Sequence, residues 1–125
     1  MLTPIDRFRI LAIDDLKSRL VLDGHESDTL IDGIDLGGQY AYDDDYLLWT
    51  TYDVPYEELL HVTLLSADLR IFDKVQLGAP YTPGILSNLA ITSPDSIGFS
   101  FFGGDRWRLQ IRPNRRLQLL RDSAE

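Results

Sequence analysis

The sequence contains no cysteine among its 125 residues, which excludes a disulfide framework and any thiolate metal site. Because nothing in the chain requires an oxidising compartment, we expect a cytoplasmic protein. The N-terminal segment MLTPIDRFRILAIDD places acids and arginines around only a short apolar run. It matches neither a secretory signal nor a membrane-spanning segment, so we expect a soluble protein that does not associate with a membrane.

Residues typical of catalytic sites are also scarce. There are two histidines: His25 lies in an acidic segment, and His61 alternates with apolar residues of a predicted strand. The segment DTLIDG at 28–33 fails the calcium-binding EF-hand pattern at its third position. We therefore predict no catalytic residue, no metal ligand and no cofactor. The adjacent carboxylates Glu57 and Glu58 keep one alternative open, a carboxylate-dependent hydrolase or metal-binding enzyme.

Charge is unevenly distributed along the chain, whose formal net charge is −8. Between Leu20 and Leu69 there is no lysine or arginine, while twelve acids fall in that stretch. From Arg106 to Arg121 six arginines stand against the single acid Asp105. Such asymmetry bears on the partners of a protein and on how fast it meets them, and it says nothing about the fold.

Arginines alternate with apolar residues in the strand predicted around 107–111. One face of this strand is apolar, and the other carries a basic row of Arg106, Arg108, Gln110 and Arg112. We expect these arginines to pair with acids of the same chain on neighbouring strands. A net charge of −8 opposes the approach of a polyphosphate, so no nucleic-acid partner is expected.

Alternation of apolar and polar residues is the dominant pattern of the sequence. It predicts eight or nine short strands separated by turn signals, the clearest at 8–12, 46–52, 60–64, 71–77, 97–101 and 107–111. We therefore predict a single globular domain, residues 1–125, of the all-β class. The strands should form an antiparallel meander that makes a sandwich or a small barrel.

Two parts of the chain are less regular. Residues 23–45 and 78–95 are rich in glycine, proline or acids and are predicted as long connections, although apolar residues at 30–36 favour a further strand in the first. Short apolar runs at 57–61 and 84–89 leave room for one short helix.

The strongest candidate for function is an acidic, aromatic stretch at residues 40–58, YAYDDDYLLWTTYDVPYEE, in which six tyrosine or tryptophan rings are interleaved with six carboxylates. Such rings anchor interfaces because they bury a large area with few rotamers, and unpaired acids steer a basic partner. The predicted partner-binding residues are Tyr42, Asp43, Asp44, Asp45, Tyr46, Asp53, Glu57 and Glu58. The alternative is that the three aspartates only form a solvated turn.

Segment 47–84 runs from LLWTTYDVPYEELLHVTLL through FDKVQLGAPYTPG. In its small size, its acidity, its lack of cysteine and the residue pattern of this segment, the chain resembles the small acidic immunity proteins that bacteria make beside polymorphic or contact-dependent toxins. The resemblance implies an inhibitor that neutralises a basic toxin domain, often a nuclease, by stoichiometric binding. Because those families differ in fold, it assigns no site residue. A self-associating structural module is the remaining alternative, and the sequence does not determine the oligomeric state.

Overall fold

The computed structural model describes residues 1–52, 59–78, 84–102 and 105–122. Within these ranges the chain forms β-strands and no helix, which confirms the all-β prediction. The strands are β1 (Leu2–Pro4), β2 (Phe8–Ala12), β3 (Lys17–Leu22), β4 (His25–Asp32), β5 (Asp35–Tyr42), β6 (Asp45–Thr51), β7 (Leu60–Leu65), β8 (Ile71–Leu77), β9 (Ser87–Ser93), β10 (Ser96–Ser100), β11 (Arg106–Ile111) and β12 (Leu117–Arg121).

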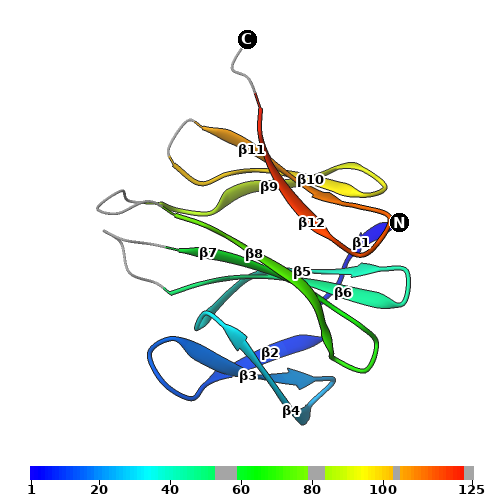
Figure 1. Cartoon of the computed structure of the whole chain (residues 1–125). Coiled ribbons are helices and arrows are strands. Elements are labelled where there is room, and N and C mark those ends of the chain that lie inside the picture. The colour runs from blue at the N-terminus through cyan, green and yellow to red at the C-terminus, as the bar shows by residue number, and fades with distance from the viewer. Residues whose placement is uncertain (53–58, 79–83, 103–104, 123–125) are drawn as a thin grey trace.

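The strands are arranged in three antiparallel sheets that stack as three layers (Figure 1). A central sheet has the order β1-β5-β6-β7-β8, an N-terminal sheet the order β2-β3-β4, and a C-terminal sheet the order β12-β11-β10-β9. None of these sheets closes on itself, so the arrangement is a sandwich and the predicted small barrel is not formed by the described residues. The described ranges contain no helix long and apolar enough to cross a membrane.

The first hydrophobic core lies between the central and C-terminal sheets. Every second residue of β6 and β7 points into it, among them Leu47, Trp49 and Val62, each fully buried. The C-terminal sheet contributes alternating residues of β10, and the ring of Phe99 meets that of Trp49 edge to face at 4.9 Å. Such aromatic pairs contribute about 0.5–1.5 kcal/mol beyond the burial of their area.

A second core lies on the opposite face of the central sheet, against the N-terminal sheet. It contains Phe8, Leu20 and Ile31 from the N-terminal sheet, and Tyr46 and Leu48 from β6. Because β6 is covered on both faces, its residues from 45 to 50 are all buried. This explains the nearly continuous apolar run at 46–49, in which neighbouring side chains serve different cores.

The predicted long connections are wrong where strands form, and the further strand favoured at 30–36 is present. Residues 23–45 contain β4 and β5, and residues 78–95 contain β9. β5 carries two glycines, and β4 and β9 lie at sheet edges, where most of their side chains are exposed and few apolar residues are needed. The helical turn considered at 84–89 is not formed, because 84–86 is irregular and β9 begins at Ser87.

Candidate functional site

The β5–β6 hairpin carries the three consecutive aspartates of the predicted site. Asp43 and Asp44 form its turn, and the flanking residues Tyr42 and Asp45 are paired across it. Asp43 has a φ of 55°, a left-handed conformation that aspartate adopts more readily than most residues. The turn predicted here is therefore present. We refer to Asp43 and Asp44 as the acidic tip.

The two residues of the acidic tip differ in their contacts. Asp43 Oδ1 accepts a hydrogen bond of 2.7 Å from the N-terminal ammonium group of Met1. This bond holds the pKa of the Asp43 carboxyl below its ordinary value. Asp44 is exposed and its side chain has no hydrogen-bond or ion-pair partner among the described residues. Asp44 is therefore the aspartate of the three whose charge is most available to a partner.

The third aspartate, Asp45, is buried in an ion pair. Asp45 is only 7% exposed, and its Oδ2 lies 2.9 Å from Nε of Arg115, which belongs to the turn between β11 and β12. Oδ2 has no well-aligned hydrogen bond among the described residues, so the contact is an ion pair. The Arg115 guanidinium also lies 5.4 Å from the centre of the Tyr42 ring. Asp45 therefore belongs to the boundary between two sheets, and it is not part of a solvated turn.

The two tyrosines of the predicted site lie in different cores. Tyr42 packs in the first core, where its hydroxyl donates a 2.7 Å hydrogen bond to Asp95 Oδ1. Burial, followed by this bond, raises the pKa of Tyr42 to about 12. Tyr46 packs in the second core against Phe8 and accepts a 3.1 Å hydrogen bond from Arg7. The structure therefore does not bring the two rings together on one surface. Asp53, Glu57 and Glu58 lie outside the described residues.

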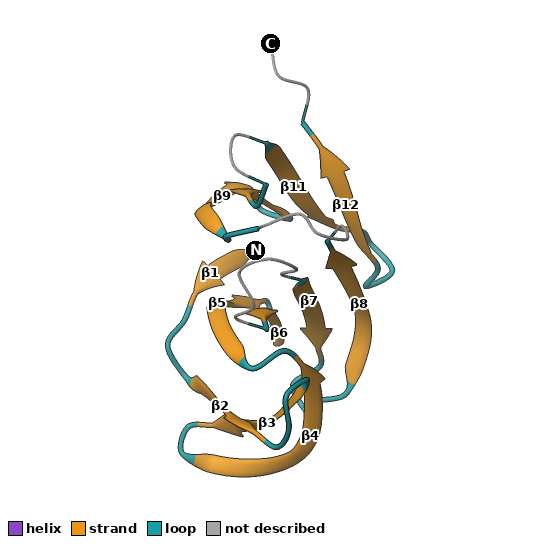
Figure 2. Ribbon diagram, turned by 90° about the vertical axis from the view of Figure 1, so that its left-hand side faces the viewer, coloured by secondary structure: helices purple, strands orange, loops and turns teal. Residues whose placement is uncertain are grey.

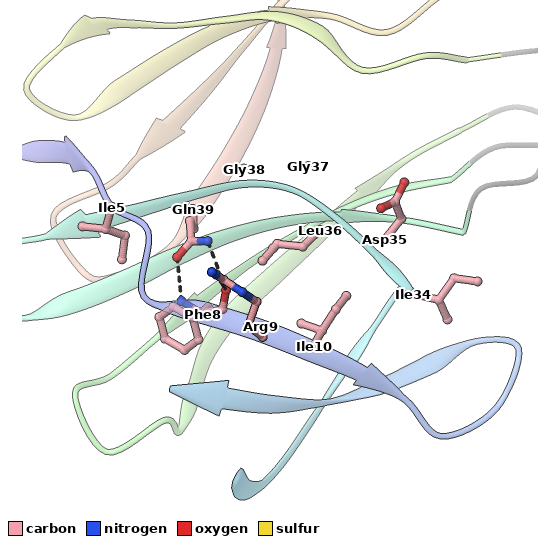
Figure 3. Close-up of a pocket in the computed structure, with 10 residues that line it drawn as sticks. All are labelled: Ile5, Phe8, Arg9, Ile10, Ile34, Asp35, Leu36, Gly37, Gly38 and Gln39. Carbon is pink, nitrogen blue, oxygen red and sulfur yellow. Dashed lines mark hydrogen bonds between the residues drawn. The ribbon is translucent and has the colours of Figure 1, made fainter. Parts of the chain in front are cut away.

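A groove of about 560 Å³ opens between β2 and β5 (Figure 3). Its lining is Ile5, Phe8, Arg9, Ile10, Ile34, Asp35, Leu36, Gly37, Gly38 and Gln39. The side chain of Gln39 spans the gap at one end: its Oε1 accepts hydrogen bonds of 2.8 Å from the backbone nitrogens of Arg7 and Phe8, and its Nε2 donates to the Phe8 carbonyl at 3.2 Å. A side chain thus makes the bonds that a neighbouring strand would make elsewhere in a sheet.

The acidic tip and the groove lie along the same edge of the central sheet. β1 pairs with residues 40–42 of β5. At one end of β1, Met1 reaches Asp43, and beyond the other end the Ile5 nitrogen donates to the Gln39 carbonyl at 3.1 Å. Figure 2 shows β1, β5 and β2 on the same side of the molecule. The groove is thus lined by the first part of β5, and the acidic tip follows the stretch of β5 that β1 covers.

A polar cluster that the sequence did not reveal lies at the other margin of the second core. Asp32 of β4 accepts hydrogen bonds from Lys17 at 2.8 Å and from Lys74 at 3.1 Å. Burial by itself would raise the pKa of Asp32, but the bonds from the two lysines outweigh it and hold the pKa below its ordinary value. Lys17 and Asp32 are cross-strand partners in β3 and β4, whereas Lys74 of β8 is far from both in sequence and is brought to Asp32 only by the tertiary structure.

His61 of β7 lies beside this cluster and is 4% exposed. It lines a cavity of about 160 Å³ together with Asp32, Lys74, Val75 and Gln76. Its Nε2 has no hydrogen-bond partner among the described residues, and burial lowers the pKa of the imidazole. A sequence signal existed: His61 and Thr63 alternate with apolar residues, so they occupy a face that is not purely apolar. The arrangement can hold a small polar molecule between donors and acceptors.

Metal binding finds no support in the geometry. Within the described ranges, no three histidine, aspartate or glutamate residues are placed so that they could hold a metal ion.

In comparisons with known proteins, no protein family, no curated protein and no solved structure matches this chain.

Proposed function

We propose that the protein is a binding module that attaches to a basic protein partner, as an immunity-type inhibitor attaches to a toxin domain. The observation that carries the proposal is the placement of the acidic tip and the groove along one edge of the central sheet. Charge at the rim of an interface accelerates encounter, whereas a desolvated pocket that receives a side chain slows release. In this proposal the acidic tip supplies the rim charge and the groove supplies the pocket.

The tyrosines are not assigned as anchors in this proposal. Tyr42 and Tyr46 are each less than a tenth exposed, and both have partners inside the protein. The anchor comes instead from the partner, whose apolar side chain would enter the groove beside Ile34 and Leu36. The acidic tip contributes long-range attraction through Asp44.

The partner should be sought first by co-purification with the product of the neighbouring gene, and its binding kinetics should then be measured at several salt concentrations. We expect Asp44→Asn to slow association several-fold and to flatten its dependence on salt, because the rim charge acts on the encounter. Asp15→Asn is the matched control, because it removes the same charge from an exposed acid in the β2–β3 turn.

The groove is tested in the same assay through dissociation. Ile34→Ala should speed dissociation about tenfold, because hydrophobic contact with the partner is lost, whereas Ile85→Ala, at a 79% exposed isoleucine away from the groove, should not. If both aspartate variants slow association equally, or if both isoleucine variants release the partner at the wild-type rate, the interface lies elsewhere and the proposal fails.

A further inference from the structure

The outer face of the C-terminal sheet carries the basic row of β11. Trp107, Leu109 and Ile111 face or pack against the first core, so Arg106 and Arg108 lie on the opposite side of the strand. The expectation that acids of this chain neutralise the row is wrong for the described residues. The cross-strand neighbours are Ser100 and Asp122 on either side of Arg106, and Gly98 and Leu120 on either side of Arg108. Asp122 is the one acid among these four, and its carboxylate forms no ion pair with Arg106.

Unpaired arginines are unusual in this chain, which has twenty acids for twelve lysines and arginines. Eight of the twelve take part in ion pairs: Arg7, Arg9, Lys17, Arg19, Lys74, Arg115, Arg116 and Arg121. Among the residues that the structure describes, no ion pair involves the remaining four: Arg70 and three members of the basic row, Arg106, Arg108 and Arg112. The basic row therefore presents positive charge that no ion pair within the described ranges neutralises.

Arg106 and Arg108 lie two residues apart on one face of β11, next to Gly98 of β10. Gly98 is the cross-strand partner of Arg108, and Nη2 of Arg106 comes within 3.6 Å of the position that a Cβ atom would take at Gly98. Gly98 itself places no side chain between them, and the methyl group of Thr92, 3.2 Å from the same position, is the nearest neighbouring atom. In addition, Nε of Arg108 is buried and has no hydrogen-bond partner among the described residues. The two side chains therefore lie on one face of β11, and one of their donors, Nε of Arg108, is buried without an acceptor among the described residues.

We propose that Arg106 and Arg108 form a binding site for the phosphate group of a small phosphorylated molecule, with Gly98 as its floor. Neighbouring like charges repel unless an anion lies between them. A phosphate dianion supplies that charge, and its oxygens accept the paired N–H bonds that planar guanidinium groups donate. A single phosphate group fits better than a long polyanion because the net charge of −8 repels extended nucleic acid.

The test is a titration of the intact protein with inorganic phosphate at constant ionic strength, followed by the nuclear magnetic resonance signals of the arginine Nε–H groups. The signal of Arg108 should shift and saturate. Arg106→Gln should weaken binding about tenfold or more through loss of charge-assisted hydrogen bonds. Arg106→Lys should also weaken it, because the charge remains while the planar fork is lost. Arg70→Gln is the control, because Arg70 is an exposed arginine before β8 that has no ion pair among the described residues. The Arg70→Gln variant should bind phosphate as the wild type does.

Ribose 5-phosphate, tested in parallel, should compete for the same signal. The proposal is overturned if chloride at equal concentration produces the same shift, if Arg70→Gln weakens binding as much as Arg106→Gln does, or if no signal saturates. It is also overturned if a single-stranded oligonucleotide binds with steep salt dependence while phosphate and ribose 5-phosphate do not, because the row would then be a polyanion surface. The thermal unfolding of each variant without ligand shows that it is folded.

Discussion

At the scale of single residues, burial decides what the aromatic and ionisable side chains of this protein can do. Tyr46 is 9% exposed and its ring meets that of Phe8 edge to face at 4.9 Å. His61 is similarly enclosed, with burial acting against its charged form. Both residues are therefore expected to act on stability, and each gives a prediction that unfolding measurements can check.

Replacement of Tyr46 by alanine should lower the free energy of unfolding by about 3–5 kcal/mol, because it removes a large buried ring and leaves a cavity in the second core. Tyr46→Phe should cost only about 1 kcal/mol, since it retains the ring and loses the hydrogen bond from Arg7. Urea-induced unfolding followed by circular dichroism measures both. Equal stability of the alanine variant and the wild type would place the ring outside the core.

His61 should make stability depend on pH. The folded chain holds the imidazole with a pKa lowered from 6.5 by burial, whereas in the unfolded chain the pKa returns to about 6.5. Below that pH the unfolded chain binds a proton that the folded chain does not, so the free energy of unfolding should fall as pH decreases from 6.5. Above 6.5 this contribution is constant.

Urea unfolding at several values between about pH 5 and pH 8 tests this dependence, in a range above the titration of ordinary carboxyl groups. His61→Gln should flatten the slope below pH 6.5. The matched control is His25→Gln, which alters the exposed histidine at the start of β4 and should leave the slope unchanged. A slope that persists in His61→Gln would assign the proton uptake to another group.

At the scale of elements, the connection between β4 and β5 carries the chain from the N-terminal sheet into the central sheet within two residues, Gly33 and Ile34. The Gly33 nitrogen donates to the Leu16 carbonyl at 2.7 Å, and the Ile34 nitrogen donates to the Thr51 carbonyl at 2.8 Å. Thr50 Oγ1 adds a bond of 2.6 Å to the Asp32 carbonyl. Gly33 has a φ of 101°, which a residue with a side chain rarely adopts.

Gly33→Ala should therefore lower the free energy of unfolding by about 3 kcal/mol. The new Cβ atom would lie 2.5 Å from Cβ and Oγ1 of Thr50, and backbone strain adds to this clash. Gly24→Ala is the comparison, because Gly24 also has a positive φ but has open space around it; strain alone should cost about 1 kcal/mol. Similar losses in the two variants, measured by urea unfolding, would show that the contact with Thr50 relaxes without cost.

At the scale of the whole molecule, three layers must stay in register around one central sheet. The ion pair between Asp45 of β6 and Arg115 links the central sheet to the C-terminal sheet. Tyr42 adds to the same boundary through its bond to Asp95 in the β9–β10 turn. The Leu2 nitrogen donates to the Pro94 carbonyl at 3.1 Å, so β1 is joined to that turn as well.

Arg115→Ala should destabilise the protein by about 2 kcal/mol, because it leaves the buried Asp45 carboxylate without its cation. The loss is smaller than that for a fully buried pair, since Arg115 is 38% exposed and solvent screens part of the interaction. In a double-mutant cycle, Arg115→Ala should lower the free energy of unfolding much less in the Asp45→Asn background than in the wild type. Strictly additive losses would mean that the two residues stabilise the fold independently.

The sequence by itself determined the strands and their turns, because alternation and turn chemistry are local properties. The hairpin of β7 and β8, the turn before β6 and the polar face of β11 all follow from residues adjacent in the chain. The edge strand β9 and the first part of β4 are not predicted, because their alternation is weak and glycine and proline interrupt the neighbouring sequence. The apolar residues at 30–36 indicate only the end of β4 and the start of β5.

Only the tertiary structure decided which surface each side chain meets. Alternation establishes that Tyr46 and Leu48 share a face, but not that β2 and β3 cover it, since the order of the sheets depends on contacts between distant parts of the chain. The same holds for charge: Asp45 finds Arg115, and Asp32 finds Lys74, through packing between separate strands. For this reason the aspartates are equivalent in sequence, whereas in the structure Asp44 has no side-chain partner among the described residues and Asp45 is buried in an ion pair.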